Sequence, residues 1–546
     1  MHAGARTSGG NGALNLRALL CRRTQVRRVH VVAVRESSIC PIAPACPICP
    51  IAPTSSILNC MTNPNDGQRP ALSSLALAGL SAAFAGQGKS IFLVGGIVRD
   101  RLIGRQSTDY DFTTDAEPSD SKRILRLVSH NVFQPGEKYG TICATLEEHE
   151  LQVTTFRGDR YAPGSRKPDV WYGVSLEEDL ARRDFTINAM ALRVDEQLAD
   201  LLATGSDTTA LFDRLVDPFG GRYDLERRVI RAVGRPDERF AEDPLRLLRA
   251  VRQATQLGFT IEPATAAAIR EGARGLETIS WERIGQEMDK LLLAPSPSAG
   301  IRLLAELDLL RFTVPELVPM VEMQQQPGRR HKDIFAHVMQ VLDKTPATRE
   351  LRWAGLLHDI AKPETMRIID GEVHFFGHEV IGARVAEKVL ARLKYDHALI
   401  STVSALVAQH MRINTYSDWT DGAVRRFMRD AGPQLANLFA LSRADITSHR
   451  FERVKAVLKN VDTLEARCRQ LEEQAEIAKM HSPLDGVALM ALTGWPPGRW
   501  IARVKDFLLD LVLDGDLDMN DTAQGEALAR AFLAIRYGWP EAELPS

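Results

Sequence analysis

A short apolar run that ends in two glycines constrains the fold of this chain more than any other feature. The run from Ile91 to Val94 has the length of a buried strand, and Gly95 and Gly96 let the backbone turn tightly into a helix that begins near Val98. An alternating segment from Asp109 to Thr114 is typical of another strand. The front of the chain is therefore predicted to combine a sheet with helices in an α+β domain.

Hydrophobic periodicity continues this mixed pattern as far as residue 156. It predicts two more helices, Ala71 to Gly86 and Ser119 to Ser129, and two more strands, Gly140 to Leu146 and Leu151 to Phe156. Residues 158–173 contain glycine, proline and several charges but little periodicity. This composition predicts a mobile loop.

From Asp243 onward the pattern is that of amphipathic helices. A short hairpin is the one exception, predicted between Met366 and Phe376 with its turn at Asp370 and Gly371. The charged segment from Phe451 to Ala478 has apolar residues three and four apart, which favours a packed helix over a partner-binding coil. An all-α region therefore follows the α+β front.

Composition limits the classes of protein that remain. Lys and Arg number 68 against 70 Asp and Glu, so a nucleic-acid site must be a local basic patch. No apolar run approaches the roughly 20 residues that span a bilayer, which predicts a soluble protein without a membrane partner. After residue 60 only Cys143 and Cys468 remain of seven cysteines, which favours a reduced, cytoplasmic protein.

The first sixty residues differ from the rest in kind. They hold five cysteines, seven arginines and a near-repeat of Cys-Pro-Ile-Ala-Pro, and proline at that density prevents both helix and sheet. The preferred interpretation is a disordered or misread extension, with Met61 as the true start. A transit peptide and a cysteine-rich metal clip stay open as alternatives.

Two carboxylates lie two residues apart on a predicted strand. Period-two geometry points Asp109 and Asp111 to the same face, where hard oxygen ligands can share magnesium ions. Such a clamp suits in-line phosphoryl transfer, because the metal neutralises a triphosphate and activates a 3′-hydroxyl. An isolated Asp-x-Asp is more often a solvated turn. Gly95 and Gly96 reverse that preference, since bare backbone N–H groups can approach a phosphate there and Arg99 adds charge.

A second polar constellation begins at Glu242. Asp243, Arg246, Arg249 and Arg252 recur every three residues, which predicts one polar stripe on a helix. A carboxylate accepts from an exocyclic amine and a guanidinium donates to a ring nitrogen or carbonyl, so the stripe suits the Watson–Crick edges of cytosine and adenine. A salt-bridged surface helix is the alternative.

Five ordered blocks carry a resemblance to a known family. They are Leu93–Asp100, Asp109–Ala116, Arg182–Met190, Asp217–Gly221 and Glu242–Arg252. Together they resemble the class II tRNA nucleotidyltransferases, or CCA-adding enzymes, and the bacterial poly(A) polymerases. The resemblance implies a polymerase-beta-like head domain followed by a helical neck.

The same resemblance implies roles for individual residues. Asp109 and Asp111 would be the catalytic magnesium ligands. Asp243 and Arg246 would act as an amino-acid template for the incoming base. The remaining residues implied to bind the nucleotide are Gly95, Gly96, Arg99, Arg183, Asp184, Asn188, Arg249 and Arg252. One position departs from the family, because Gln152 stands where relatives tend to carry an acidic residue, and Glu150 is the nearest carboxylate on the same face.

Histidines and aspartates recur along the helical region. His337, His358 with Asp359, and Asp445 resemble the core ligands of the HD phosphohydrolase superfamily, with His378 and His410 as extra candidates. Imidazoles combined with carboxylates suit a second divalent metal of the transition series. A scaffold that keeps these ligands without hydrolase activity is the alternative.

Head, neck and HD region together resemble actinobacterial-type CCA-adding enzymes over roughly residues 90–513. The predicted division is an extension (1–60), a head (61–215), a neck with the templating helix (216–325), an HD domain (326–450) and a helical tail (451–546). The basic stretches 329–332 and 422–429 either grip tRNA phosphates or are solvated faces.

The predicted function is addition of C, C and A to tRNA from CTP and ATP. The loop with Arg157, Asp159, Tyr161 and Arg166 favours complete CCA addition, because CC-only relatives look shortened there. Three alternatives stay open: a poly(A) polymerase, a CC- or A-only enzyme, and an HD-type phosphohydrolase with an RNA-binding head.

Overall fold

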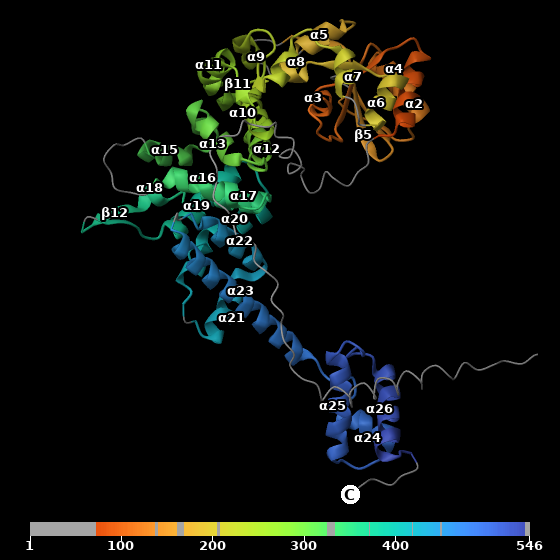
Figure 1. The fold of residues 1–546 in the computed structure, drawn as a ribbon, viewed down its shortest axis with the longest axis vertical. Helices are drawn as coiled ribbons and strands as arrows, with labels where there is room; N and C mark the ends of the chain where they lie inside the picture. Colours follow the sequence, from red (N-terminus) through yellow and green to blue (C-terminus); the bar gives the residue numbers. More distant parts are fainter. Residues whose placement is uncertain are drawn as a thin grey trace, which may run out of the picture. The chain divides into compact units, whose positions relative to one another are not determined.

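The computed structural model describes residues 72–540 (Figure 1), apart from 137–139, 161–168, 205–207, 325–332, 371, 418 and 448–449. The chain divides into two units, Met1–Cys60 and Met61–Ser546, and every described residue belongs to the second. The predictions for the first sixty residues therefore lie outside the described residues, as do those for Tyr161, Arg166 and the basic stretch 329–332.

The head is built on a seven-stranded sheet with the order β3-β4-β5-β2-β1-β8-β9. Only β2 and β5 are parallel neighbours in this sheet. The strands are β1 (Ile91–Val94), β2 (Tyr110–Thr114), β3 (Val132–Gly136), β4 (Thr141–Leu146), β5 (His149–Thr155), β8 (Ala191–Arg193) and β9 (Leu215–Val216). The helices are α2 (Ser74–Ala85), α3 (Gly96–Leu102), α4 (Pro118–Val128), α5 (Leu176–Ala181), α6 (Glu196–Thr204) and α7 (Thr208–Asp213).

The predicted α+β class is confirmed, and local chemistry explains why the first elements form. Ser73 caps α2 by accepting the Ala76 N–H, and the helix buries Leu77, Leu80 and Phe84. The β1 run is buried as the sequence predicts, and Gly95 adopts a left-handed φ of 79° between β1 and α3. The glycine turn that follows β1 therefore lies beside β2, because the two strands are paired in the sheet.

The prediction of a mobile loop at residues 158–173 is wrong at both ends. β6 (Arg157–Arg160) and β7 (Asp169–Tyr172) form an antiparallel pair in which Gly158 lies opposite Trp171. A Cβ at Gly158 would lie 2.2 Å from an indole carbon of Trp171, so only glycine lets the ring cross the neighbouring strand. Four-residue strands rich in charge carry too little periodicity to be recognised from sequence.

The neck contains α8 (Gly221–Glu226), α9 (Pro236–Glu242), α10 (Leu245–Leu257), α11 (Pro263–Gly272), α12 (Trp281–Leu292), α13 (Pro297–Glu306), α14 (Leu310–Thr313) and α15 (Val318–Gln324). A parallel pair, β10 (Val229–Ile230) with β11 (Thr260–Ile261), was not predicted, because two-residue strands have no period.

The prediction that Asp243 lies on a helix is also wrong. α9 ends at Glu242 and α10 begins at Leu245, so Asp243 lies on the link between them with φ −144° and ψ 99°. Pro244 explains this, because a proline ring excludes the helical conformation for the residue before it. Arg246, Arg249 and Arg252 do lie on α10.

The HD region consists of α16 (Ile334–Lys344), α17 (Arg349–Leu357), α18 (Lys362–Thr365), α19 (His378–Arg392), α20 (His397–Gln409), α21 (Asp421–Ala431) and α22 (Leu435–Asp445). The predicted hairpin is confirmed as β12 (Met366–Ile369) and β13 (Glu372–Phe375), with Ile369 opposite Glu372. The predicted long helix is also confirmed, as α23 (Phe451–Lys479).

The last helices, α24 (Gly486–Thr493), α25 (Arg499–Leu513) and α26 (Thr522–Tyr537), pack together (Figure 1). They surround a small apolar core of their own that includes Leu489, Trp500, Leu508 and Leu533. Among the described residues, no helix has the combination of length and apolar character that crossing a membrane requires.

Candidate active site and metal centre

The paired aspartates lie at the start of β2. Asp109 is exposed directly before the strand, and Asp111 is half-buried between Tyr110 and Phe112, which point to the core. A hollow beside Asp109 is lined by Thr108, Asp109, His149, Glu150 and Gln152. The structure therefore places one carboxylate at an open surface and the other at its edge.

The charge of Asp111 is poorly tolerated in the protein alone. Burial is the main cause that raises the pKa of Asp111 from 3.8 to about 6, and the charge on Asp109 adds to the rise. Arg183 and Arg249 oppose it. A divalent cation between two carboxylates would relieve both the desolvation and the repulsion, so the electrostatics of this pair fit a metal site.

The backbone of Gly95 lies close to the side chains of Arg183 and Asp111. A Cβ on this residue would lie 3.2 Å from Nη1 of Arg183 and 3.5 Å from Oδ2 of Asp111. Arg183 is itself buried beside Asp179, with 3.5 Å between Nη2 and Oδ2. The glycine turn thus lets one guanidinium and one carboxylate approach the same point of the main chain.

Asp184 is buried and bonded to two other residues that the sequence analysis singles out. Its side chain is only 7% exposed and accepts hydrogen bonds from Nδ2 of Asn188 (3.0 Å) and Nε of Arg249 (2.8 Å). Asn188 in turn accepts from Nη1 of Arg99 at 2.8 Å. Burial opposes ionisation, yet Arg249 and the Asn188 hydrogen bond hold the pKa of Asp184 well below its usual value. The structure therefore brings these four predicted residues together, with Asp184 at their centre.

Asp243 and Arg246, the residues that the sequence analysis expects to recognise the base, are held by hydrogen bonds to neighbouring residues. Asp243 accepts from the Leu245 N–H at 3.2 Å and from Nη2 of Arg283 at 3.1 Å. Arg246 donates to Oε2 of Glu242 and to the carbonyls of Arg239 and Arg182. Arg283 escaped sequence reasoning because it lies 40 positions from Asp243, and no local pattern links residues at that separation.

Arg252 lies further along α10 and pairs with a residue of α12. Its Nε lies 2.5 Å from Oε2 of Glu287, and both side chains are largely buried. Glu287 also escaped the sequence analysis. Arg252 therefore joins α10 to α12 in this structure.

The family's missing carboxylate can be placed by register. Gln152 on β5 lies directly opposite Asp111 on β2, so an amide occupies the position next to the buried carboxylate. Glu150 is exposed one pleat earlier and lines the hollow shared with Asp109. Any third acidic ligand from β5 would therefore lie on the side of Asp109 rather than that of Asp111.

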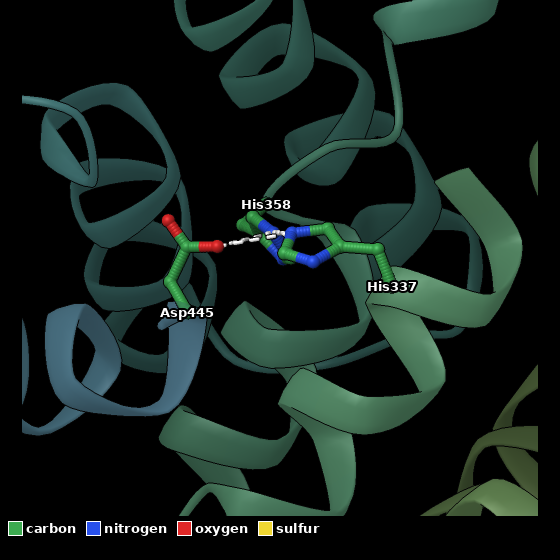
Figure 2. A group of neighbouring side chains, drawn as sticks. All are labelled: His337, His358 and Asp445. Atoms are coloured by element: carbon green, nitrogen blue, oxygen red, sulfur yellow. Dashed lines mark hydrogen bonds and ion pairs between the residues drawn. The ribbon is translucent and has the colours of Figure 1, made fainter. Parts of the chain in front are cut away.

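A second group of possible ligands lies among the HD helices. His337 on α16, His358 after α17 and Asp445 at the end of α22 come from three separate elements, and Figure 2 shows the carboxylate pointing toward both rings. Oδ1 of Asp445 lies 3.0 Å from Nε2 of His337 and 3.7 Å from Nε2 of His358. The two Nε2 atoms are 3.4 Å apart.

Asp359 connects this group to another. Its Oδ2 faces His337 and His358 at 3.4 and 3.3 Å, and its Oδ1 faces His378 and His410 at 3.5 and 3.7 Å. Asp359, His378 and His410 form the other cluster with metal-ligand geometry among the described residues. Oδ1 of Asp359 is buried and accepts no hydrogen bond from the described part of the chain. One carboxylate is thus shared by two clusters.

The outer nitrogens fix the direction of the four rings. Nδ1 lies 2.9 Å from the Gly355 carbonyl in His358, 2.7 Å from that of Phe375 in His378 and 2.7 Å from that of Val407 in His410. In His337 it lies 2.8 Å from the Thr447 hydroxyl. A carbonyl can only accept, so Nδ1 carries a proton in three rings, and in the neutral form of each ring the lone pair is on the inward-facing Nε2. Lone pairs that converge with carboxylates fit divalent transition metals.

A mixed sheet with paired aspartates, a polar helical neck and a histidine–aspartate cluster together define a nucleotidyltransferase with an HD domain. Family models agree: the Poly A polymerase head domain matches residues 91–231, the probable RNA and SrmB-binding site of polymerase A matches 258–320, and the HD domain matches 330–449.

The matches with similar proteins cover nearly the whole length of those proteins. The A-adding tRNA nucleotidyltransferase of Deinococcus radiodurans is 34% identical over 79% of this chain and 93% of its own. The CCA-adding enzyme of Geobacillus thermodenitrificans is 31% identical over 79% and 90%. The Bacillus stearothermophilus CCA-adding enzyme in complex with CTP superposes with a TM-score of 0.50 at 26% identity, over 85% of this chain and 98% of that one. The chain belongs to the family of class II tRNA nucleotidyltransferases and bacterial poly(A) polymerases, with an HD domain.

Replacing Asp111 with Asn is expected to stabilise the metal-free protein by about 1–2 kcal/mol at about pH 7.5. The folded-state pKa lies above the unfolded one, so Asp111 costs stability as pH rises through about 4 to about 6 and costs nothing below that window. Thermal unfolding in EDTA at about pH 7.5 and pH 4 measures this. A variant that is less stable than wild type at the higher pH would contradict the argument, and added magnesium should shrink the difference.

Dialysed protein titrated with Co²⁺ or Mn²⁺ is expected to bind two ions per chain at the HD clusters. His378→Ala should remove one of them, and Asp359→Asn should weaken both, because that carboxylate faces both clusters. His374→Ala is the matched control, since this histidine stacks on Phe376 outside the clusters. Unchanged stoichiometry in both cluster variants, measured by elemental analysis, would rule out binding there.

Proposed function

We propose that the protein adds C, C and A to the 3′ ends of tRNA from CTP and ATP by metal-dependent transfer without a nucleic-acid template. The observation that carries this is the convergence of Asp111, Arg183 and Gly95 at the head, joined through the Asp184–Arg249 pair to the helix that bears Arg246. The proposed substrate is a cytoplasmic RNA, and we therefore propose that the protein is cytoplasmic.

The head residues would handle the triphosphate. Asp109 and Asp111 would hold magnesium, which supplies charge neutralisation and lowers the pKa of the attacking hydroxyl when it is bound. Arg183, whose guanidinium lies against Gly95, would offer N–H donors to phosphate oxygens. The Gly95 backbone allows this approach because it has no side chain to fill the space.

The neck residues would choose the base. Asp243 can accept from N4 of cytosine or N6 of adenine, groups that uracil and guanine replace by carbonyl oxygens. The protein contacts of Arg246 use three of its five N–H groups, which leaves Nε and one Nη2 hydrogen for a base edge. Discrimination would therefore come from donor and acceptor pattern rather than from pairing with RNA.

Addition of A alone is a second candidate. The relative that is 34% identical over most of this chain is named an A-adding tRNA nucleotidyltransferase, whereas the one at 31% is named a CCA-adding enzyme. The number and identity of the nucleotides added decide between them.

The HD clusters support a further proposal, that this region binds divalent transition metals and hydrolyses a phosphoester. The four imidazoles and two carboxylates form a donor set of the kind that activates water. A metal-bound scaffold is the competing role. Exposed Arg425, Arg426 and Arg429 on α21 could meet tRNA phosphates in either case.

Purified protein incubated with tRNA lacking CCA, CTP, ATP and magnesium is expected to extend the RNA by three nucleotides, read by product sequencing. Asp109→Ala combined with Asp111→Ala should lower the rate by about a thousandfold or more, because the metal ligands are lost. The tail offers a control of equal spacing, Asp516→Ala with Asp518→Ala, in which both residues are exposed. Extension by A alone would select the second candidate, a long A tail would indicate a poly(A) polymerase, and full activity in the double variant would refute the metal site.

Hydrolysis of a 2′,3′-cyclic nucleotide in the presence of Mn²⁺ or Co²⁺ tests the HD proposal. Wild-type protein should hydrolyse it and His358→Ala should not, because this ring is fully buried and faces both Asp359 and Asp445. If neither protein hydrolyses the substrate and the variant also loses nucleotide incorporation, the scaffold role holds instead.

A further inference from the structure

Helix α12 carries two charged residues, one turn apart, that hold the polar residues of the neck. Nη2 of Arg283 lies 3.1 Å from Oδ2 of Asp243, and Oε2 of Glu287 lies 2.5 Å from Nε of Arg252. Residues four apart lie on one face of a helix, and α10 and α12 pack against each other. One face of α12 therefore supports both ends of the stripe that begins at Asp243.

Asp243 needs such support because it has little of its own. It lies on the link between α9 and α10, outside both helices, and among the described residues its other oxygen accepts one hydrogen bond, from the Leu245 N–H at 3.2 Å. With Arg283 in place, both carboxylate oxygens have a partner. Each oxygen has two lone pairs, so the carboxylate is oriented and still able to accept from a ligand.

The opposite side of α12 is packed too closely to shift. A Cβ at Gly285 would lie 2.9 Å from the Leu393 carbonyl oxygen, and the hydroxyl oxygen of Tyr395 lies 2.8 Å from the Gly285 carbonyl and 2.7 Å from Oδ1 of Asp289. Trp353 also donates to Asp289 at 2.8 Å. Arg283 therefore projects from a helix whose position is set by the HD region.

We propose that Arg283 is a positioning residue that orients the Asp243 carboxylate and so determines the selection of CTP and ATP over UTP and GTP. This rests on the proposed function, because it requires Asp243 to face the base. An oriented carboxylate oxygen meets an amine in cytosine and adenine but a carbonyl oxygen in uracil and guanine, and two acceptors repel each other. A carboxylate free to rotate would lose this repulsion as well as the attraction.

The experiment compares Arg283→Met and Arg283→Lys with wild type in the full chain. Incorporation of each nucleotide separately into tRNA lacking CCA gives kcat and KM, and equilibrium dialysis with CTP and UTP gives binding without RNA. Arg274→Met is the matched control, because Arg274 is an exposed neck arginine that pairs with Glu277 one turn away on its own segment. Arg283 is 41% exposed, so the variants are expected to keep the melting temperature of wild type.

Arg283→Met is expected to lower the ratio of kcat/KM for CTP over UTP by about tenfold, mainly through a higher KM for CTP, and to lower the binding preference equally. Arg283→Lys should recover most of the selectivity, since an ammonium can still reach the carboxylate, and Arg274→Met should not change it. A selectivity within twofold of wild type in Arg283→Met overturns the proposal. So does a wild-type protein that binds CTP and UTP equally, whereas wild-type protein that prefers CTP but extends no tRNA refutes the proposed function alone.

Discussion

The ion pair between the buried Asp184 and the partly exposed Arg249 is the interaction on which the candidate active site depends. It connects the head to α10, and Asn188 extends it by bonding both Asp184 and Gln253 at 3.0 Å. Loss of Arg249 is costly, because it leaves an uncompensated charge on the buried Asp184. An ion pair and side-chain hydrogen bonds, rather than the length of a loop, therefore hold the carboxylates of β2 near the arginines of the neck.

Two helices of the all-α region, α12 and α17, connect the neck to the HD region. α12 meets α10 through Arg283 and Glu287 and meets the HD region through Asp289, which accepts from Trp353 and Tyr395. α17 carries Trp353 and ends next to His358. A scaffold contribution from the HD region to nucleotide selection thus has a physical route, independent of any hydrolysis there.

Strong local patterns were enough to predict the elements that carry them. The apolar run of β1, the helix α2 and the hairpin turn at Asp370 all appear where the sequence places them. The failures share a cause, since they concern constraints that spacing does not encode. A three-residue repeat placed Asp243 on a helix, but Pro244 excludes that conformation. The Arg283 contact spans 40 positions and the Gly158–Trp171 crossing depends on strand pairing, so neither has a local signature. Asp111, Arg183 and Gly95 lie close together in the head, and their roles stay predictions.

The position of Asp359 between the two clusters limits how the HD region can change in evolution. Its two oxygens serve opposite clusters, so a single substitution there would remove a ligand from both at once. Loss of one imidazole, such as His410, would affect only its own cluster. A change at Asp359 therefore affects both clusters, whereas a change at Asp445 or at one of the histidines affects one of them.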